Sequence, residues 1–305
     1  MLNLTNLVDT VVWESCRNHH PFKLENTHHL KKFNDVVKDL SSKYDGTISY
    51  FENSKSLSGR FMSYAEGTPI FPLFKFVPQT YFIETFEPTH YWKSCDIDES
   101  VTDRLLSYRL FKYDLPYKDF DYEPNYRLYV CHSIFDLDKS AIVKSAVWAH
   151  THKQRVVIRL GTIRDVADTE NKYEKLIDQI YSSGVSKDLF IVDLHSHIDD
   201  LVDNCKMMWS ANSGVGFAAL LKGKPVSHFY KDIDYSYGPV ARFTHSADEA
   251  FDEDFCIDYD VVRRYFTWYY KRLCVDLNRD DAIDMIDEKL FRYFKQKQSM
   301  SEMLI

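Results

Sequence analysis

A short stretch in the second half of the chain has the residues of an anion-binding turn: Asn212, Ser213, Gly214, Val215 and Gly216. Apolar residues before and after it predict a strand that enters the turn and a helix that leaves it. Glycines allow close backbone approach, and the first N–H groups and the positive end of a helix favour a phosphate. The Ser213 hydroxyl adds a donor. The same glycines would also serve close packing of a helix on a strand, so phosphate binding and packing both stay open.

Three more candidate ligands come at or directly after segments with the pattern of strands: His132, Arg159 and His195. The carboxyl ends of parallel strands share one edge of a sheet, where open α/β sheets bind their ligands. We therefore expect these side chains at the same edge as the turn. Arg159 could neutralise a phosphate, and His195 could contact phosphate or act as a base. His197 could do the same, or it could simply begin the next helix.

From residue 125 onward, segments with strand and helix periodicity alternate. Strands are expected at 127–131, 155–160, 189–194, 207–210 and 225–229, and helices at 139–151, 172–182, 198–204 and 214–222. Gly184 is the expected stop of the second helix. The first helix is expected to bury one face, formed by Ile142, Val143, Ala146 and Val147. This alternation predicts the α/β class, with a parallel sheet and crossover helices on its faces.

The first half of the chain is less regular. Its expected elements are a helix, a strand, and a region of short strands and long loops, at 30–40, 47–51 and 66–92 respectively. Residues 259–295 have the pattern of two helices rich in aromatic residues. A polar stretch with two prolines, at 113–125, predicts a boundary between one domain at 1–122 and a second at 123–305.

The block N-S-G-V-G-F-x-A-L-L-x-G-K-P-V, which runs from residue 212 to residue 226, resembles the capsule-polysaccharide-synthesis family. That family includes the Kdo transferases of bacterial surface glycans. The resemblance implies a GT-B-like glycosyltransferase of two Rossmann-like domains, the N-terminal one irregular, with closing helices at the C-terminus. It implies that residues 1–122 bind the acceptor and that residues 123–305 bind the donor. The donor would be a CMP- or UDP-sugar, used as co-substrate with no metal or other cofactor.

Two positions depart from the family pattern. Ala218 stands where the family usually has a glutamate that would hold a ribose. Arg159, Leu160, Gly161 and Thr162 stand where a Lys-x-His-Pro motif often follows the middle strand. These differences bear on the base and sugar of the donor more than on the fold.

The resemblance also implies an acidic residue at the end of a strand in the N-terminal domain. The segment 81–88 fits this position loosely and supplies two candidate catalytic residues, Glu84 and Glu87. A carboxylate that faces a cleft could deprotonate an acceptor hydroxyl. Glu84 is preferred because it follows an apolar segment, and the alternative for either residue is a solvated loop position.

A rival hypothesis starts from two D-x-D pairs, Asp119 with Asp121 and Asp136 with Asp138. Metal-dependent glycosyltransferases of the GT-A type use two nearby aspartates to hold a divalent cation on the diphosphate. Such pairs also occur by chance in an acidic chain. We therefore keep the metal-free scheme.

Composition separates the possible acceptors. The formal net charge of −8 argues against general adhesion to nucleic acid, so the family's acceptor, a surface glycan, comes first. A chain with 9 Gly beside 21 Tyr and 21 Phe is nevertheless typical of large phages. A phage enzyme would transfer a sugar, for example a pentose such as arabinose, to hydroxymethylcytosine in DNA. A third hypothesis is a nucleotide-sugar-binding protein without catalysis.

The expected location is the cytoplasm, or the host cytoplasm for a phage protein. No apolar run is long enough to span a bilayer, and the N-terminus lacks the pattern of a signal peptide. The cysteines are widely spaced, with no C-x-x-C pair for zinc or redox chemistry.

Overall fold

The computed structural model describes residues 61–64, 73–78, 90–107, 121–131, 135–160, 166–211, 213–229, 240–252, 254–276 and most of 279–288. The chain divides into two compact units. The larger unit comprises residues 97–111 and 115–266, and the smaller one comprises 1–96, 112–114 and 267–305. The domain boundary at residue 122 stays a prediction.

The larger unit contains an open six-stranded sheet in which every neighbouring pair of strands is parallel. The order across the sheet is β5-β4-β3-β6-β7-β8. Its strands are β3 (Tyr126–Val130), β4 (Val156–Arg159), β5 (Phe190–Asp193), β6 (Cys205–Ser210), β7 (Val226–His228) and β8 (Arg242–Phe243). The predicted α/β class is confirmed.

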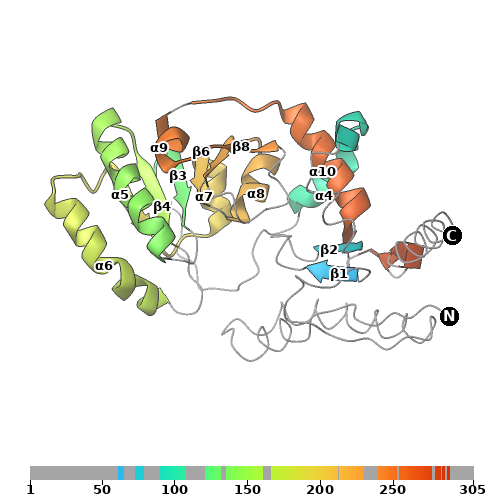
Figure 1. Cartoon of the computed structure of the whole chain (residues 1–305), viewed down its shortest axis with the longest axis horizontal. Coiled ribbons are helices and arrows are strands. Elements are labelled where there is room, and N and C mark those ends of the chain that lie inside the picture. The colour runs from blue at the N-terminus through green and yellow to red at the C-terminus, as the bar shows by residue number, and fades with distance from the viewer. Residues whose placement is uncertain are drawn as a thin grey trace, which may run out of the picture. The chain divides into compact units, whose positions relative to one another are not determined.

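Helices join the strands and cover both faces of the sheet: α5 (Phe135–His152), α6 (Val166–Ser182), α7 (Ile198–Asn204), α8 (Val215–Leu221) and α9 (Ala247–Asp252). The chain runs through α5 and α6 from β3 to the edge strand β5, and α7 then returns it to β6 on the other side of β3. Figure 1 shows α5 and α8 on opposite sides of the sheet. The direction of strand order thus reverses between β3 and β6, and this switch point is where such sheets bind ligands.

The predicted elements of this unit are found close to their expected bounds. Helix α7 matches the prediction at both ends, and α6 begins six residues earlier than expected, at Val166 instead of residue 172. Gly184 has a φ of +97°, which a residue with a side chain rarely adopts, and it ends the turn after α6 as predicted.

The predicted buried face of α5 is wrong in part. Ile142 and Ala146 are buried, but Val143 and Val147 are 39% and 56% exposed. The residues that turn inward instead are Ala141, Ser145, Trp148 and Ala149. Small residues at every fourth position let the helix backbone approach the sheet, so the packed stripe is rotated away from the valines.

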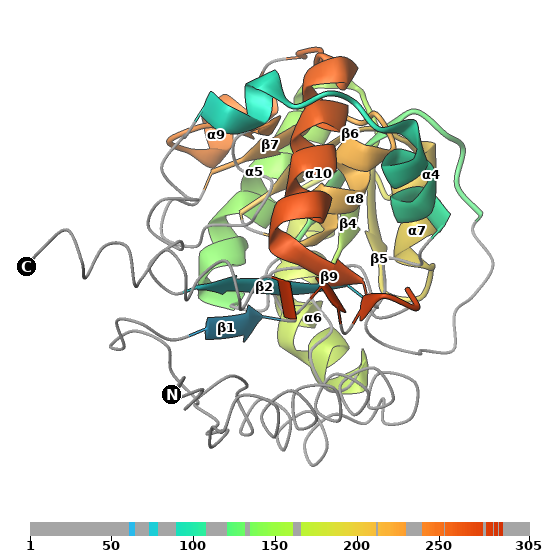
Figure 2. The same cartoon turned by 90° about the vertical axis from the view of Figure 1, so that its right-hand side faces the viewer.

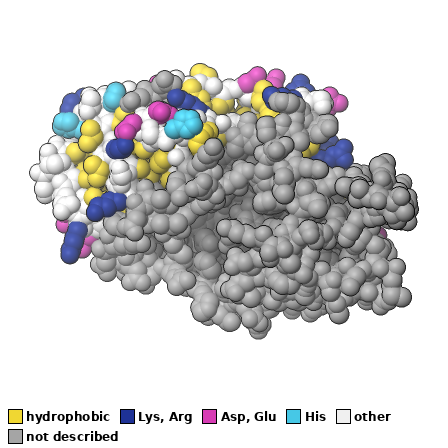
Figure 3. All heavy atoms as spheres, viewed as in Figure 1, with side chains coloured by type: hydrophobic (Ala, Val, Ile, Leu, Met, Phe, Trp, Pro, Cys, Tyr) yellow, Lys and Arg dark blue, Asp and Glu magenta, His cyan; other side chains and the backbone are white. Residues whose placement is uncertain are grey.

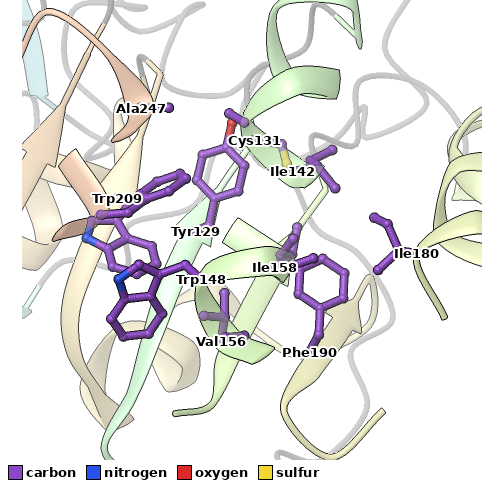
Figure 4. Close-up of a cluster of buried hydrophobic side chains, with 14 of the residues drawn as sticks. Tyr129, Cys131, Ile142, Trp148, Val156, Ile158, Ile180, Phe190, Trp209 and Ala247 are labelled. Carbon is purple, nitrogen blue, oxygen red and sulfur yellow. The ribbon is translucent and has the colours of Figure 1, made fainter. Parts of the chain in front are cut away.

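Large aromatic side chains fill the space between the sheet and α5. The indole rings of Trp148 and Trp209 meet edge to face, with centroids 5.1 Å apart (Figure 4). The Arg127 guanidinium lies 4.4 Å from the Trp148 ring centroid and 5.1 Å from that of Trp209. Burial of a side chain of this size contributes about 2–3 kcal/mol, so this cluster holds α5 on the sheet.

On the opposite face, α8 is enclosed by the first half of α10 (Tyr259–Leu273) and by α4 (Glu99–Ser107). The rings of Phe217 and Phe266 have centroids 4.3 Å apart, and the Tyr259 hydroxyl donates to the carbonyl of Leu221 across 2.6 Å. Figure 2 shows α10 passing in front of α8. These contacts fix the helix that follows the glycine turn.

The smaller unit has a three-stranded antiparallel sheet of β1 (Phe61–Tyr64), β2 (Leu73–Pro78) and β9 (Cys274–Asp276), and the short helix η1 (His90–Ser94). The prediction of two helices over 259–295 is wrong at its centre, because α10 ends at Leu273 and strand β9 follows directly. Val275 pairs with Phe74 of β2, so non-local pairing overrides the helical pattern. The expected elements at 30–40 and 47–51 lie outside the described residues.

Candidate functional site

The glycine turn lies at the switch point. It follows β6 at Ser210 and leads into α8, beside the end of β3, where Cys131 is the last described residue. Gly214 is the N-cap of α8, with φ −57° and ψ −18°. Asn212 and His132 lie outside the described residues. The predicted strand–turn–helix arrangement is therefore confirmed, and its phosphate-binding role stays a prediction.

Hydrogen bonds inside the turn already involve the first amides of α8. The Val215 N–H donates to the Ser213 hydroxyl at 3.3 Å, and the Gly216 N–H donates to the Ser213 carbonyl at 3.0 Å. The Phe217 N–H donates to the carbonyl of Gly214 at 3.1 Å. A phosphate at this turn would share or replace these acceptors, and the positive helix end would still favour its charge.

Arg159 is the last residue of β4, one residue before the predicted end of this strand, and its charge is paired. Its Nη1 donates to Oδ1 of Asp193, the last residue of β5, across 3.1 Å. The two side chains are only 4% and 2% exposed. Arg159 thus contacts a carboxylate that sequence reasoning did not single out.

The Asp193 carboxylate is a centre of hydrogen bonds. Besides Arg159, its Oδ1 accepts from the backbone N–H of His195 at 3.1 Å and of Ser196 at 3.0 Å. Its Oδ2 accepts from the hydroxyls of Ser196 and Tyr122, each at 2.7 Å. Burial, followed by the contact with Asp193, raises the pKa of the Tyr122 hydroxyl. A charge taken from water needs such partners, and here five donors supply them.

The two histidines after β5 have different surroundings. His197 is the N-cap of α7, and its Nδ1 accepts from the Asp199 N–H at 3.1 Å. Of the two roles considered for His197, beginning the helix is the one observed. His195 is partly exposed, and its backbone is fixed by Asp193.

Sequence reasoning missed His228 and Ser210 at the ends of β7 and β6. They are partners in the parallel register, so their side chains share one face of the sheet. Burial lowers the pKa of His228 to about 4, which keeps its imidazole neutral at pH 7. Within the described part of the chain, the buried Ser210 hydroxyl has no hydrogen-bond partner. The sequence could have pointed to His228 through its position alone, because it follows the Gly-Lys-Pro-Val end of the block that resembles the family.

The structure does not test the other candidates. Glu84, Glu87 and Asp119 lie outside the described residues. Asp121 is exposed, and the backbone of Asp136 and Asp138 forms the start of α5. In the ranges that the structure describes, no helix is both long and apolar enough to cross a membrane.

No family model and no curated protein matches the sequence. Solved structures do resemble the fold. The KpsC β-Kdo 2,4 transferase of Thermosulfurimonas dismutans has a TM-score of 0.46 at 10% identity, covering 87% of this chain and 90% of its own. The KpsC β-Kdo 2,7 transferase of the same organism has 0.42 at 12%, covering 95% and 99%.

A third similar structure is the UDP-GlcNAc 2-epimerase of Methanocaldococcus jannaschii, in complex with UDP-GlcNAc and UDP. Its TM-score is 0.34 at 10% identity, covering 60% of this chain. The chain spans 50% of the length of that enzyme.

Proposed function

We propose that this protein is a GT-B-type glycosyltransferase that moves a sugar from a CMP- or UDP-sugar to a hydroxyl of a surface glycan. The observation that carries the proposal is the turn between β6 and α8, which lies at the switch point of an open parallel sheet and directs a helix N-terminus toward it. The sequence block around this turn supports the same reaction class.

In this proposal, the turn from Ser213 to Gly216, with Asn212 before it, holds the donor phosphate. The positive end of α8 stabilises the negative charge that develops on the leaving nucleotide. The acceptor hydroxyl loses its proton to Glu84, with Glu87 as the alternative base. The scheme needs no metal, because the helix end and neighbouring side chains offset the charge.

The other three donor ligands of the proposal come from the strands on one side of the turn. His132, Arg159 and His195 end or follow β3, β4 and β5, which lie side by side in that order. Arg159 and His195 therefore share the carboxyl edge of the sheet with the turn, where a donor lying along the edge can be contacted at more than one point.

The glycan remains ahead of DNA as the acceptor. On the described part of the face in Figure 3, Lys and Arg side chains are scattered among acidic and apolar ones. DNA binding depends on a gathered basic surface that can neutralise phosphates. Hydroxymethylcytosine DNA is accordingly a second arm of the acceptor test.

The first experiment measures thermal stabilisation by CMP, UDP, GDP and ADP and by their sugars. Saturable stabilisation by CMP or UDP is expected, followed by transfer to a glycan acceptor or slow donor hydrolysis. Glu84→Ala should then abolish turnover and preserve nucleotide binding, and Glu87→Ala tests the alternative base in the same assay. Turnover unchanged in both variants would remove the proposed base.

Binding of a nucleotide by the parent protein without any turnover would favour the non-catalytic protein, and no binding at millimolar nucleotide would refute the phosphate site.

A further inference from the structure

The hydrogen bonds of Asp193 connect three parts of the larger unit. Its carboxylate joins β5 to Arg159 of β4, to Tyr122 in the segment before β3, and to the turn that contains His195 and Ser196. A buried ion pair contributes little net stability compared with apolar residues of similar size. Hydrogen bonds that converge on one carboxylate instead restrict the relative geometry of the groups that they join. What this network fixes is the conformation of the turn after β5.

The turn carries two histidines at different positions. His197 is the N-cap of α7, and His195 follows the last strand residues with its backbone N–H held by Asp193. His195 is partly exposed at the carboxyl edge of the sheet. An imidazole is both a hydrogen-bond donor and an acceptor, which suits a hydroxyl group as well as a phosphate.

Strand spacing separates His195 from the glycine turn. The turn follows β6 and His195 follows β5, and the order β5-β4-β3-β6 places three interstrand spacings between them. At about 4.8 Å each, these spacings put the two strand axes about 14 Å apart, which is much more than the width of one phosphate. His195 must therefore meet a different part of any donor whose phosphate binds at the turn.

We infer that Asp193, Arg159 and Tyr122 are positioning residues that hold His195 against a hydroxyl group of the donor, on its ribose or on the sugar to be transferred. This inference rests on the proposed function. It assigns Arg159 a role through Asp193 in place of direct contact with phosphate. The ribose and the sugar both offer hydroxyl groups to an imidazole. Probes with and without the sugar distinguish the two contacts.

The test is a double-mutant cycle on Tyr122→Phe and His195→Ala, with affinity measured by calorimetry. The probes are UDP with UDP-N-acetylglucosamine, and CMP with CMP-Kdo. One neutral hydrogen bond corresponds to about fivefold in affinity, so we expect His195→Ala to weaken binding about fivefold and Tyr122→Phe about threefold. The double variant should be no weaker than His195→Ala alone, because Tyr122 acts through His195.

Tyr181→Phe is the matched control. The Tyr181 hydroxyl donates to the carbonyl of Phe190, at the opposite end of the same strand, across 2.9 Å. Its loss should lower the melting temperature about as much as Tyr122→Phe and leave donor affinity unchanged. A purely structural role of Tyr122 would make the two variants alike in affinity.

Amide hydrogen exchange gives a second measurement that needs no nucleotide. The amides of His195 and Ser196 should exchange faster in Tyr122→Phe and at the parent rate in Tyr181→Phe. Unchanged exchange in Tyr122→Phe would overturn the inference whatever the nucleotide results.

The calorimetric outcomes separate the two proposals. If the variants already bind UDP or CMP, which carry no sugar, more weakly than the parent does, the contact is with the ribose. If only the affinity for the nucleotide sugars falls, the contact is with the sugar. Normal binding by both single variants, or losses that multiply in the double variant, would overturn the positioning role and leave the proposed function standing. Failure of the parent protein to bind any of the four probes would remove the proposed function, and the donor contact of His195 with it.

Discussion

Nη1 of Arg159 donates to Oδ1 of Asp193 across 3.1 Å, so the last residues of two neighbouring strands are joined by a buried ion pair. Both side chains are almost fully enclosed. The pair shows that the carboxyl edge of the sheet is organised by charge as well as by apolar packing. Removing one charge of the pair should destabilise the fold more than removing both charges, because a single buried charge is then left without its partner.

The first prediction concerns that pair. Arg159→Met leaves the Asp193 carboxylate buried without its cation and should lower the free energy of unfolding by about 3–5 kcal/mol. The double variant Arg159→Met with Asp193→Asn removes both charges and should recover part of this loss. Urea denaturation at pH 7 measures both. A loss below about 1 kcal/mol in Arg159→Met would mean that solvent or another group compensates Asp193.

The second prediction concerns pH. Burial lowers the pKa of His228 to about 4, whereas an unfolded histidine titrates near 6.5. Between these values the unfolded chain binds more protons, so this contribution to stability is full above pH 6.5 and declines as the pH falls toward 4. Relative to His228→Gln, the parent protein should lose about 2 kcal/mol more between pH 7 and pH 5. Denaturation at both pH values gives the comparison, and a His228 imidazole signal that titrates near pH 6.5 in the folded protein would contradict it.

Local patterns predicted most elements of the larger unit because its strands are short and apolar and its helices repeat their apolar residues with helical spacing. The turn between Ser213 and Gly216 was found from the small residues that separate a strand pattern from a helix pattern. The stop at Gly184 was found because a positive φ favours glycine. The buried face of α5 was missed because apolar character alone favoured Val143 and Val147. Close helix packing on the sheet selected small residues and Trp148 instead.

The candidate site was harder to predict because its contacts are non-local. Arg159 and Asp193 are 34 residues apart in sequence, and Tyr122 is 71 residues from Asp193. No local pattern tells which carboxylate an arginine will meet. Strand order also depends on non-local pairing, so local patterns could not separate His195 from the glycine turn, although both follow strands.

The third prediction concerns the position where the resembled family has glutamate. Ala218 is buried on α8, a helix enclosed by aromatic rings of its own unit. A carboxylate there would lose its hydration without a cation in place, so Ala218→Glu should destabilise the protein by about 3–5 kcal/mol and gain no donor affinity. Ala218→Ser, with a smaller and neutral side chain, is the control and should cost about 1 kcal/mol. Melting temperature and nucleotide affinity measure both effects. Native stability with tighter donor binding in Ala218→Glu would mean that this position faces the donor.

The last prediction isolates the phosphate site from the packing role of the glycine turn. Gly214 has φ −57° and ψ −18°, angles that alanine adopts without strain. Gly214→Ala should therefore keep or slightly raise the melting temperature, because alanine restricts the unfolded chain. If the backbone approaches a phosphate closely here, the added methyl group should weaken CMP or UDP binding by at least about tenfold, which is about 1.4 kcal/mol.

The control for this variant should give the opposite result. Gly184 has a φ of +97° and lies between α6 and β5, at the other end of the strands. Gly184→Ala should therefore lower the melting temperature by straining the backbone and leave nucleotide affinity unchanged. Parent-like affinity in Gly214→Ala would show that the glycine serves packing, and the donor phosphate would then have to bind elsewhere. Gly214→Ala is expected to change nucleotide affinity and Gly184→Ala the melting temperature. Measuring both quantities for both variants therefore distinguishes loss of the binding site from loss of the fold.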